Sequence, residues 1–225
     1  MKRIIFCLLF GISLICTSIT VFASDDDNML SRAESIFPRT FISRGFSDGN
    51  SFTWPSDHGI THSWDYMEPG GVRACAVENA DDSRYFPCFE AGGNYYGSLE
   101  NFWLKIEIMP KSISGGEHCF VRYNTPDEKS AVYITPGDDV SKIDKSRNSN
   151  DWTTYEDLTY DDPSSDYWMD VIRYSGKTYI YIDNSFVTSF NDGISGRVAW
   201  NFGIVTSGSG SSGTCYFDNL FVYRQ

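Results

Sequence analysis

The chain has 225 residues, of which 18 are lysine or arginine and 30 are aspartate or glutamate, so its formal net charge is −12. This balance excludes nucleic acid as an expected partner, because binding to phosphates needs clustered basic residues, and it argues against an anionic membrane surface. Aromatic residues make up 16% of the chain and charged residues 21%, which is typical of a packed globular protein. The abundance of tyrosine and phenylalanine favours β-strands, since aromatic side chains fit a half-buried pleated surface.

Residues 1–23 have the pattern of a secretory signal peptide. A basic start at Lys2 and Arg3 is followed by an apolar run, and the segment ends in small residues at Ala23. The apolar run is short for a membrane anchor. A lipid anchor on Cys16 is a second alternative, but the small residue expected just before such a cysteine is missing.

We expect a secreted mature chain over residues 24–225, located outside the cell, in a periplasm or at the cell surface, with no membrane span. Loss of the basic start leaves 16 basic and 30 acidic residues, a net charge of −14. The glycine- and serine-rich stretch 207–213 is followed by one strand only, which is too little to bury a second core. We therefore expect a single domain whose last strand returns to the main sheet.

Four cysteines remain after removal of the signal peptide, an even number as expected in an oxidising compartment. They are Cys75, Cys88, Cys119 and Cys215. A metal site is a poor alternative, because the chain has no Cys-x-x-Cys pair and its three histidines are scattered relative to the cysteines.

The register of an expected hairpin selects one of the three possible disulfide connectivities. Residues 72–79 and 84–91 have the pattern of two strands around a polar turn, and this register places Cys75 opposite Cys88. Directly opposed residues lie within the span of a disulfide. By elimination Cys119 pairs with Cys215, closing a loop of close to a hundred residues that adds roughly 4–5 kcal/mol in the chain-entropy model.

Short β-rich runs separated by turn signals predict an antiparallel sandwich. No stretch of twelve residues keeps a helical apolar period. The expected strands cover residues 72–79, 84–91, 102–109, 119–124, 131–135, 168–174, 178–183, 185–190, 197–205 and 214–223.

Two turns and three loops punctuate this pattern. Ser175-Gly176-Lys177 and Asp183-Asn184 mark tight hairpins, because Gly, Asp and Asn tolerate a positive φ. The expected loops are 47–59, the acidic stretch 138–166 and the stretch 207–213.

The order of motifs resembles the concanavalin A-like lectin/glucanase superfamily. The motifs are Phe-x-Asp-Gly…Trp from residue 46, Phe-Trp-Leu-Lys-Ile-Glu-Ile from 102, Phe-Val-Arg-Tyr-Asn from 120, Tyr-Trp-Met-Asp-Val-Ile-Arg-Tyr from 167, Gly-Arg-Val-Ala-Trp-Asn-Phe-Gly from 196 and Cys-Tyr-Phe-Asp-Asn-Leu-Phe-Val-Tyr from 215. The most similar branches are laminin-G-like and 3-keto-disaccharide-hydrolase-like domains. The resemblance implies an all-β fold, a two-sheet antiparallel jelly-roll sandwich with a concave face that often holds sugar.

A sugar site needs flat aromatic faces and polar groups that hydrogen-bond to hydroxyls. Arg122 and Arg173 interrupt apolar strands, and a strand-centre charge needs a polar environment, so we place both on the concave sheet. The candidate ligand-binding residues are Arg122, Asn124, Arg173, Trp152, Trp64 and His62. Because a net charge of −14 repels anions at long range, the expected partner is a neutral glycan.

Catalysis is the main alternative to lectin-like binding. A glycosidase needs two carboxylates about 5–9.5 Å apart, and no strand carries the alternating acids of the glucanase branch. We therefore expect a non-catalytic carbohydrate-binding domain with no catalytic residues. If the protein is instead a glycoside-active enzyme, Asp170, Glu107 and His62 are the first suspects. A protein-binding adhesion or envelope domain of laminin-G type is the third alternative.

A structural calcium ion is the cofactor that the resemblance suggests. In several jelly-roll carbohydrate-binding modules an aspartate of the last strand binds calcium together with residues near the N-terminus, and here Asp218 and Asp48 match those positions. Calcium needs six to eight oxygen ligands, and surface acids that only aid solubility are the simpler reading.

Overall fold

The computed structural model describes residues 28–44, 73–77, 85–91, 98–112, 118–125, 130–136, 139–144, 151–157, 166–205 and 213–225. The expected signal peptide and the expected loop 47–59 lie outside these residues. The elements are α1 (Met29–Ile36), β1 (Arg39–Arg44), β2 (Arg73–Val77), β3 (Tyr85–Ala91), β4 (Phe102–Ser112), β5 (His118–Asn124), β6 (Ser130–Ile134), β7 (Asp139–Asp144), β8 (Asp151–Asp157), β9 (Tyr167–Tyr174), β10 (Lys177–Ile182), β11 (Ser185–Asn191), β12 (Ala199–Val205) and β13 (Gly213–Arg224). Among them no helix is long and apolar enough to cross a membrane.

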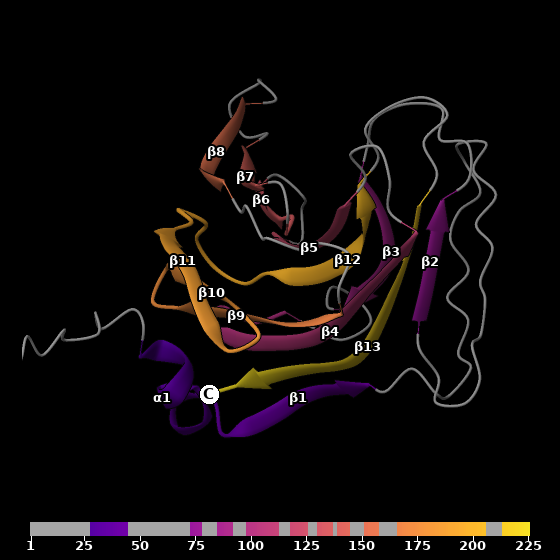
Figure 1. The fold of residues 1–225 in the computed structure, drawn as a ribbon. Coiled ribbons are helices and arrows are strands. Elements are labelled where there is room, and N and C mark those ends of the chain that lie inside the picture. Colours follow the sequence, from indigo (N-terminus) through magenta and orange to yellow (C-terminus); the bar gives the residue numbers. More distant parts are fainter. Residues whose placement is uncertain are drawn as a thin grey trace, which may run out of the picture.

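The strands form two antiparallel sheets packed face to face (Figure 1). Sheet A has the order β1-β13-β4-β9-β10-β11, with β2 also paired to β13, and sheet B has the order β3-β12-β5-β6-β7-β8. The two ends of sheet B rise above its centre at β5, so its outer face is concave (Figure 1). This arrangement confirms the predicted all-β jelly-roll sandwich.

The hydrophobic core lies between the two sheets and follows the alternation of each central strand. Leu104 and Ile106 of β4 are fully buried, as are Met169 and Val171 of β9. They pack in one cluster with residues of sheet B such as Val121. Alternate residues of the same strands lie on the outer faces, because successive side chains of a strand point to opposite sides.

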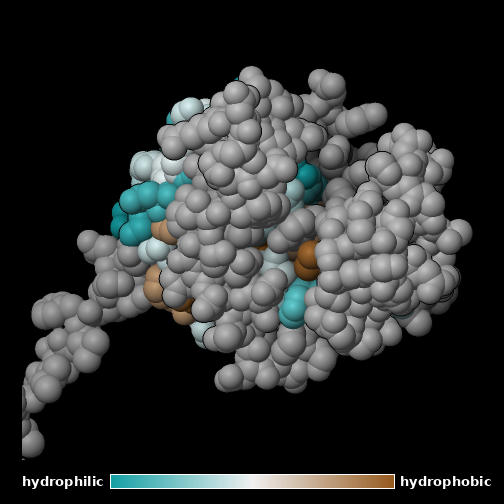
Figure 2. Space-filling model, turned by 90° about the horizontal axis from the view of Figure 1, so that it is seen from above, coloured by the Kyte–Doolittle hydropathy of each residue, from teal (hydrophilic) through white to brown (hydrophobic). Residues whose placement is uncertain are grey.

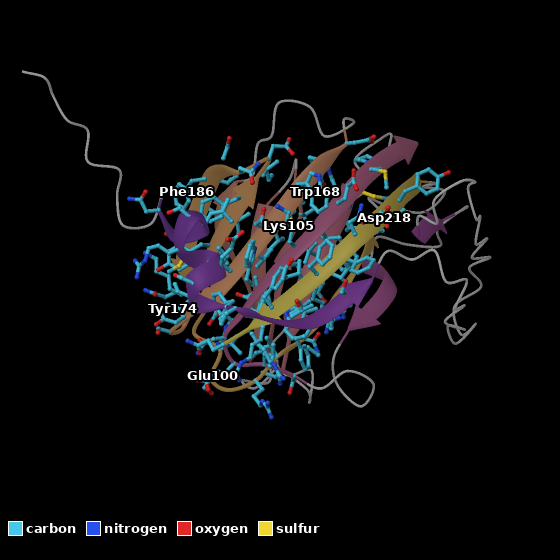
Figure 3. The ribbon with its side chains drawn as sticks, turned by 90° about the horizontal axis from the view of Figure 1, so that it is seen from below. Glu100, Lys105, Trp168, Tyr174, Phe186 and Asp218 are labelled. Carbon is cyan, nitrogen blue, oxygen red and sulfur yellow. A yellow bond between two sulfur atoms is a disulfide. The ribbon has the colours of Figure 1, made fainter. Side chains whose placement is uncertain are left out.

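The outer faces of both sheets carry buried side chains, among them Phe120 and Asn201 on sheet B. Viewed from the side of sheet B, a few separate hydrophilic and hydrophobic residues of the described part are visible (Figure 2). On the opposite side α1 lies across the strands of sheet A (Figure 3). Met29, Ala33 and Phe37 pack there against aromatic residues that include Trp103 and Tyr181, so part of the outer face of sheet A is already occupied by the chain itself.

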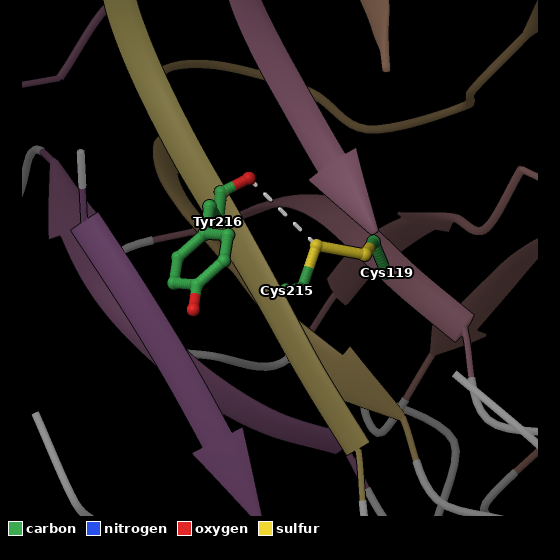
Figure 4. Close-up of a disulfide and its surroundings, with 3 residues drawn as sticks. All are labelled: Cys119, Cys215 and Tyr216. Carbon is green, nitrogen blue, oxygen red and sulfur yellow. Dashed lines mark hydrogen bonds between the residues drawn. A yellow bond between two sulfur atoms is a disulfide. The ribbon is translucent and has the colours of Figure 1, made fainter. Parts of the chain in front are cut away.

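The disulfide between Cys119 and Cys215 joins the two sheets (Figure 4). Cys119 belongs to β5 of sheet B and Cys215 to β13 of sheet A, and their Cα atoms lie 6.5 Å apart. Both residues are buried. The predicted pairing is confirmed, and it links segments 96 residues apart in the sequence.

The predicted hairpin of residues 72–79 and 84–91 is wrong. β2 pairs with β13 in sheet A, whereas β3 pairs with β12 in sheet B. Alternation and a polar turn are equally compatible with two strands that separate into different sheets, and only long-range pairing decides between these outcomes. Cys75 stands opposite Cys215 in the ladder. The side chains of Cys75 and Cys88 lie outside the described part, so their pairing stays a prediction, now as a second link between the sheets.

Two kinds of element escape the sequence patterns. The predicted loop 138–166 contains β7 and β8, whose polar sequences lack the apolar alternation of a central strand. β8 is the edge strand of sheet B and β7 is its neighbour. β1 was not expected either. α1 is eight residues long, which is too short for a helical period to stand out.

The remaining strands and both hairpins agree with expectation. Asp183 and Asn184 have φ values of 49° and 64°, and Ser175 and Gly176 have 54° and 77°. Each pair forms a two-residue turn, since Ile182 faces Ser185 and Tyr174 faces Lys177. The last strand, β13, returns to sheet A between β1 and β4, as predicted.

Peptide mapping without reduction tests the disulfides. We expect one linked peptide pair for Cys119–Cys215 and one for Cys75–Cys88. Replacing Cys119 and Cys215 by Ala should lower the free energy of unfolding by about 4–5 kcal/mol, because the long loop regains its freedom in the unfolded chain. A Cys75–Cys215 or Cys75–Cys119 peptide in the untreated protein would show that the assignment is wrong.

Candidate functional site

The outer face of sheet B carries polar side chains at its centre. In β5, Val121 and Tyr123 point into the core, so Arg122 and Asn124 lie on the outer face. In β12 the neighbours of Asn201 are core residues, Trp200 and Phe202, which places Asn201 on the same outer face. Three polar side chains thus occupy the middle of a sheet whose inner side is apolar.

The strand register aligns these residues into a row across the whole sheet. Arg122 stands opposite Asn201 of β12 on one side and Tyr133 of β6 on the other. Continued through the outer strands, the row consists of Glu90, Asn201, Arg122, Tyr133, Ser141 and Thr154. Every position in this row is a residue that can donate or accept a hydrogen bond.

Arg122 is partly exposed and stacks on Tyr133. Its guanidinium carbon lies 5.2 Å from the centre of the Tyr133 ring, within the range of a cation–π contact. Its Nε is shielded from solvent and has no hydrogen-bond partner among the described residues. Leaving such a donor unpaired costs about 1–3 kcal/mol. The contact with the Tyr133 ring holds the guanidinium in place although this donor has no partner among the described residues.

Asn124 and Asn201 form a short hydrogen-bond relay. The Nδ2 of Asn124 donates to the backbone oxygen of Thr125 at 2.9 Å. The Nδ2 of Asn201 points to the Oδ1 of Asn124 at 3.5 Å. The Oδ1 of Asn201 is buried and has no partner in the described part of the chain.

Unpartnered buried polar atoms concentrate on this face. In the described part they occur on six side chains: His118, Arg122, Thr135, Asp170, Trp200 and Asn201. His118 and Arg122 lie four residues apart on β5 and therefore share a face, and Asn201 stands beside Arg122. Buried polar groups are normally paired, whereas His118, Arg122 and Asn201 each have a buried polar atom without a partner among the described residues.

Sequence reasoning found part of this set. Arg122 and Asn124 were predicted, and Trp152 takes the ladder position in line with Asn124 through Ala131 and Ile143. The side chain of Trp152 and the whole of Trp64 and His62 lie outside the description, so their roles stay predictions. Asn201, Tyr133 and His118 were missed. The alternation of Asn201 with Trp200 and Phe202 was the available signal.

Arg173 is not on the concave face, contrary to our expectation. It lies on β9 in sheet A and is 1% exposed. Its Nε is 2.5 Å from Oδ2 of Asp192, and its terminal nitrogens donate to the backbone oxygens of Glu100, Ile194 and Gly196. The polar environment that a strand-centre arginine needs comes from the segment after β11, which no local pattern of β9 reveals.

The same carboxylate connects Arg173 to the other sheet. The hydroxyl of Tyr123, on β5, donates to Oδ2 of Asp192 at 3.0 Å and lies 2.7 Å from Oγ1 of Thr178. Burial and the charge of Asp192 raise the pKa of Tyr123 well above its usual value, so this phenol stays protonated. Arg173 therefore has a structural role, and we no longer place it in a sugar site.

The carboxylates suspected of catalysis lie on the outer face of sheet A, opposite to Arg122. Asp170 is buried, accepts a hydrogen bond from Nε1 of Trp103 at 2.7 Å and lies 4.0 Å from Nζ of Lys105. Burial raises its pKa, while the bond from Trp103 and the charge of Lys105 lower it. Lys105 also lies over Trp168, 5.0 Å from the ring centre (Figure 3).

Asp218 and Glu107 face each other in neighbouring strands of sheet A. The Nδ2 of Asn219 donates to both carboxylates, at 2.8 Å to Glu107 and 3.2 Å to Asp218. Burial raises the pKa of Asp218, and Glu107 adds to that rise. No group of three or more potential metal ligands occurs within the described residues, and Asp48 lies outside them. The calcium site of Asp48 and Asp218 therefore stays a prediction.

The buried ion pair predicts a large stability effect. Replacing Arg173 by Met leaves Asp192 buried without its counter-ion, and we expect a loss of about 3–5 kcal/mol in the free energy of unfolding. Replacing Arg173 by Met and Asp192 by Asn together should lose less. Arg197→Met, an exposed arginine in the same segment, serves as the control in urea denaturation. Equal and small effects of Arg173→Met and Arg197→Met would contradict the structural role.

The burial of Asp170 predicts that replacing it changes the Tm in a pH-dependent way. Because burial raises the pKa of Asp170 in the folded state, its carboxyl penalises folding increasingly as the pH rises above the ordinary pKa of about 4, and the penalty vanishes below that pH. Asp170→Asn should therefore raise the Tm at pH 7, and the gain should shrink as the pH approaches 4. Glu100→Gln, at an exposed carboxylate, should change the Tm little at either pH. A gain of equal size at both pH values would refute the burial argument.

The fold is shared with several polysaccharide-active proteins of known structure. An alginate lyase of polysaccharide lyase family 7 matches with a TM-score of 0.50 and 14% identity, over 84% of this chain and 97% of that one. An endo-β-galactosidase from Clostridium perfringens that releases GlcNAcα1-4Gal matches with a TM-score of 0.52 and 14% identity, over 82% and 62%. The laminarinase catalytic domain from Thermotoga maritima matches with a TM-score of 0.51 and 9% identity, over 83% and 98%.

Sequence comparison adds no assignment. No protein family matches the chain, and no curated protein resembles it closely enough to count as a relative. At these low identities the structural similarity shows the fold alone and leaves activity open. The chain has the concanavalin A-like jelly-roll fold that its motifs indicated.

Proposed function

We propose that the protein is a secreted carbohydrate-binding domain that holds a glycan on the outer face of sheet B without cleaving it. The three similar structures are named as an alginate lyase, an endo-β-galactosidase and a laminarinase, which supports a carbohydrate ligand for this fold. The buried disulfide between Cys119 and Cys215 supports export, because disulfides persist in oxidising compartments.

The observation that carries the proposal is the group of free polar atoms around Arg122. Arg122 and Asn201 stand directly opposite each other in the sheet. The donor Nε of Arg122 and the acceptor Oδ1 of Asn201 both lack a partner among the described residues. A sugar offers hydroxyl groups that satisfy both kinds of atom. Tyr133 and Phe120 form a small aromatic cluster on the same side of the sheet, and both rings are buried.

The proposed glycan is neutral. A net charge of −14 for the mature chain repels an anionic polymer at long range. Arg122 is one cation in a chain of negative net charge, and its role is to donate hydrogen bonds rather than to attract charge from a distance.

The two described acids that were suspected of catalysis do not lie on the proposed sugar-binding face. Hydrolysis by the common glycosidase mechanism needs two carboxylates flanking the sugar. Glu107 lies on β4 and Asp170 on β9, two neighbouring strands of sheet A. Neither residue shares a face with Arg122, which lies on sheet B. A glycoside-active enzyme of the same fold remains the alternative, and release of reducing sugar from a bound glycan would establish it. If no glycan on the array is bound, the protein-binding adhesion role is favoured instead.

Arg122→Met is the direct test. The change keeps most of the volume of the arginine stem and removes its donors. We expect at least about tenfold weaker binding of the glycan that gives the strongest array signal, equivalent to about 1.4 kcal/mol for a lost charged hydrogen bond. The Tm should change little, because Arg122 has no carboxylate partner among the described residues that the change would strand.

Lys105→Met is the matched control for this test. Lys105 is also a part-exposed cation stacked on an aromatic ring, but it lies on sheet A, so its loss changes the net charge equally and leaves the outer face of sheet B intact. Titration calorimetry with the same glycan should show unchanged affinity for Lys105→Met. Equal weakening by both variants would mean that overall charge, and not this site, governs binding.

A further inference from the structure

Hydrogen bonds around Asn201 fix which way its side-chain amide points. The Nδ2 of Asn124 donates to the backbone oxygen of Thr125, and a carbonyl oxygen can only accept. The Oδ1 of Asn124 is therefore the atom that faces Asn201, and the group facing it must be the Nδ2 of Asn201. The oxygen of the Asn201 amide is left without a partner among the described residues, and rotation of the amide would place two oxygens against each other.

The oxygen of the Asn201 amide and the Nε of Arg122 need opposite hydrogen-bonding groups from a ligand. Arg122 needs an acceptor, whereas Asn201 needs a donor. The two residues stand directly opposite each other on β5 and β12, yet neither atom satisfies the other. One group between them would have to accept from Arg122 and donate to Asn201.

We propose that Asn201 is the specificity-determining residue of this face and selects the hydroxyl groups of a neutral sugar against carboxylate or sulfate groups. This inference rests on the proposed carbohydrate-binding function and names the substrate class of that site. A hydroxyl oxygen accepts from Nε of Arg122 while its hydrogen is donated to Oδ1 of Asn201. An ionised carboxylate has acceptors only, so it would pair with Arg122 but place a negative oxygen against Oδ1 of Asn201.

The selection arises from a local arrangement and not only from the net charge. An arginine on its own favours acidic ligands, because hydrogen bonds between charged groups are the stronger ones. The fixed acceptor beside Arg122 reverses that preference, since an unsatisfied or repelled polar group in a shielded site is costly. Removing the acceptor, or releasing its orientation, should therefore weaken the discrimination against acidic sugars.

Two variants test this with soluble polysaccharides as probes. Laminarin and galactan serve as neutral probes and alginate and pectate as acidic ones, in affinity electrophoresis at constant ionic strength. Asn201→Leu removes the acceptor, and we expect at least about tenfold weaker binding of the neutral probe, with a lower ratio of neutral to acidic affinity. Asn124→Leu removes the partner that orients Asn201, so the amide can turn its Nδ2 outward, and the same ratio should fall even where Asn201→Leu folds poorly.

Asn191→Leu is the control, because Asn191 is an exposed asparagine on β11 of sheet A, and it should leave both affinities unchanged. The double variant Arg122→Met/Asn201→Leu should bind the neutral probe no more weakly than the worse single variant, since one hydroxyl group connects both contacts. Tighter binding of an acidic probe than of any neutral one by the unaltered protein would overturn the role of Asn201 and leave carbohydrate binding intact. Parallel loss of neutral and acidic binding in both asparagine variants would overturn it as well. Absence of binding to all four polysaccharides and to every array glycan would instead overturn the proposed function.

Discussion

The buried ion pair of Arg173 and Asp192 is the interaction on which the position of the candidate site depends. Asp192 begins the segment that leaves β11 in sheet A and enters β12 in sheet B. Arg173 holds that segment by its carboxylate and by two of its backbone oxygens, and Tyr123 fastens the same carboxylate to sheet B. Because β12 follows directly, the network fixes where Asn201 meets Arg122.

The outer face of sheet A is covered in part by the chain itself. On sheet A, α1 buries Met29 and Ala33 against aromatic residues of β4 and β10, and the backbone N–H of Leu30 donates to the hydroxyl of Tyr181. On sheet B, Arg122 and Asn201 at the centre of the polar row each have a buried polar atom without a partner in the described part of the chain. A face that keeps unpaired donors and acceptors has a cost in stability, and a ligand that pairs them recovers that cost on binding.

The fold could be predicted from the sequence because its signals are local and repeated. The apolar alternation of β4 and β9, the positive-φ turn at Asp183-Asn184 and the motifs of the last sixty residues each indicate an antiparallel sandwich. What failed was long-range pairing. Residues 72–79 and 84–91 have the pattern of a hairpin but separate into two sheets. The polar strand β7 and the edge strand β8 carry too little apolar periodicity to be distinguished from a loop.

The site was predicted in part for the same reason. The alternation of Arg122 with Val121 and Tyr123 correctly places it on the outer face of its strand. Arg173 shows the same alternation and is buried, because its counter-ion comes from a segment nineteen residues later that folds back over the end of the core. Asn201 is an unremarkable polar residue in the sequence. Its proposed role depends on the strand register, which places it beside Arg122, and on the hydrogen bond that orients its amide.

A structure of the protein with a bound neutral oligosaccharide tests the central claim most directly. The account predicts a sugar on the concave face of sheet B, with one hydroxyl oxygen within about 3.2 Å of both Nε of Arg122 and Oδ1 of Asn201. A sugar bound elsewhere, for example beside Trp168 on sheet A, would contradict the account, and so would a sugar on sheet B that makes no contact with either atom.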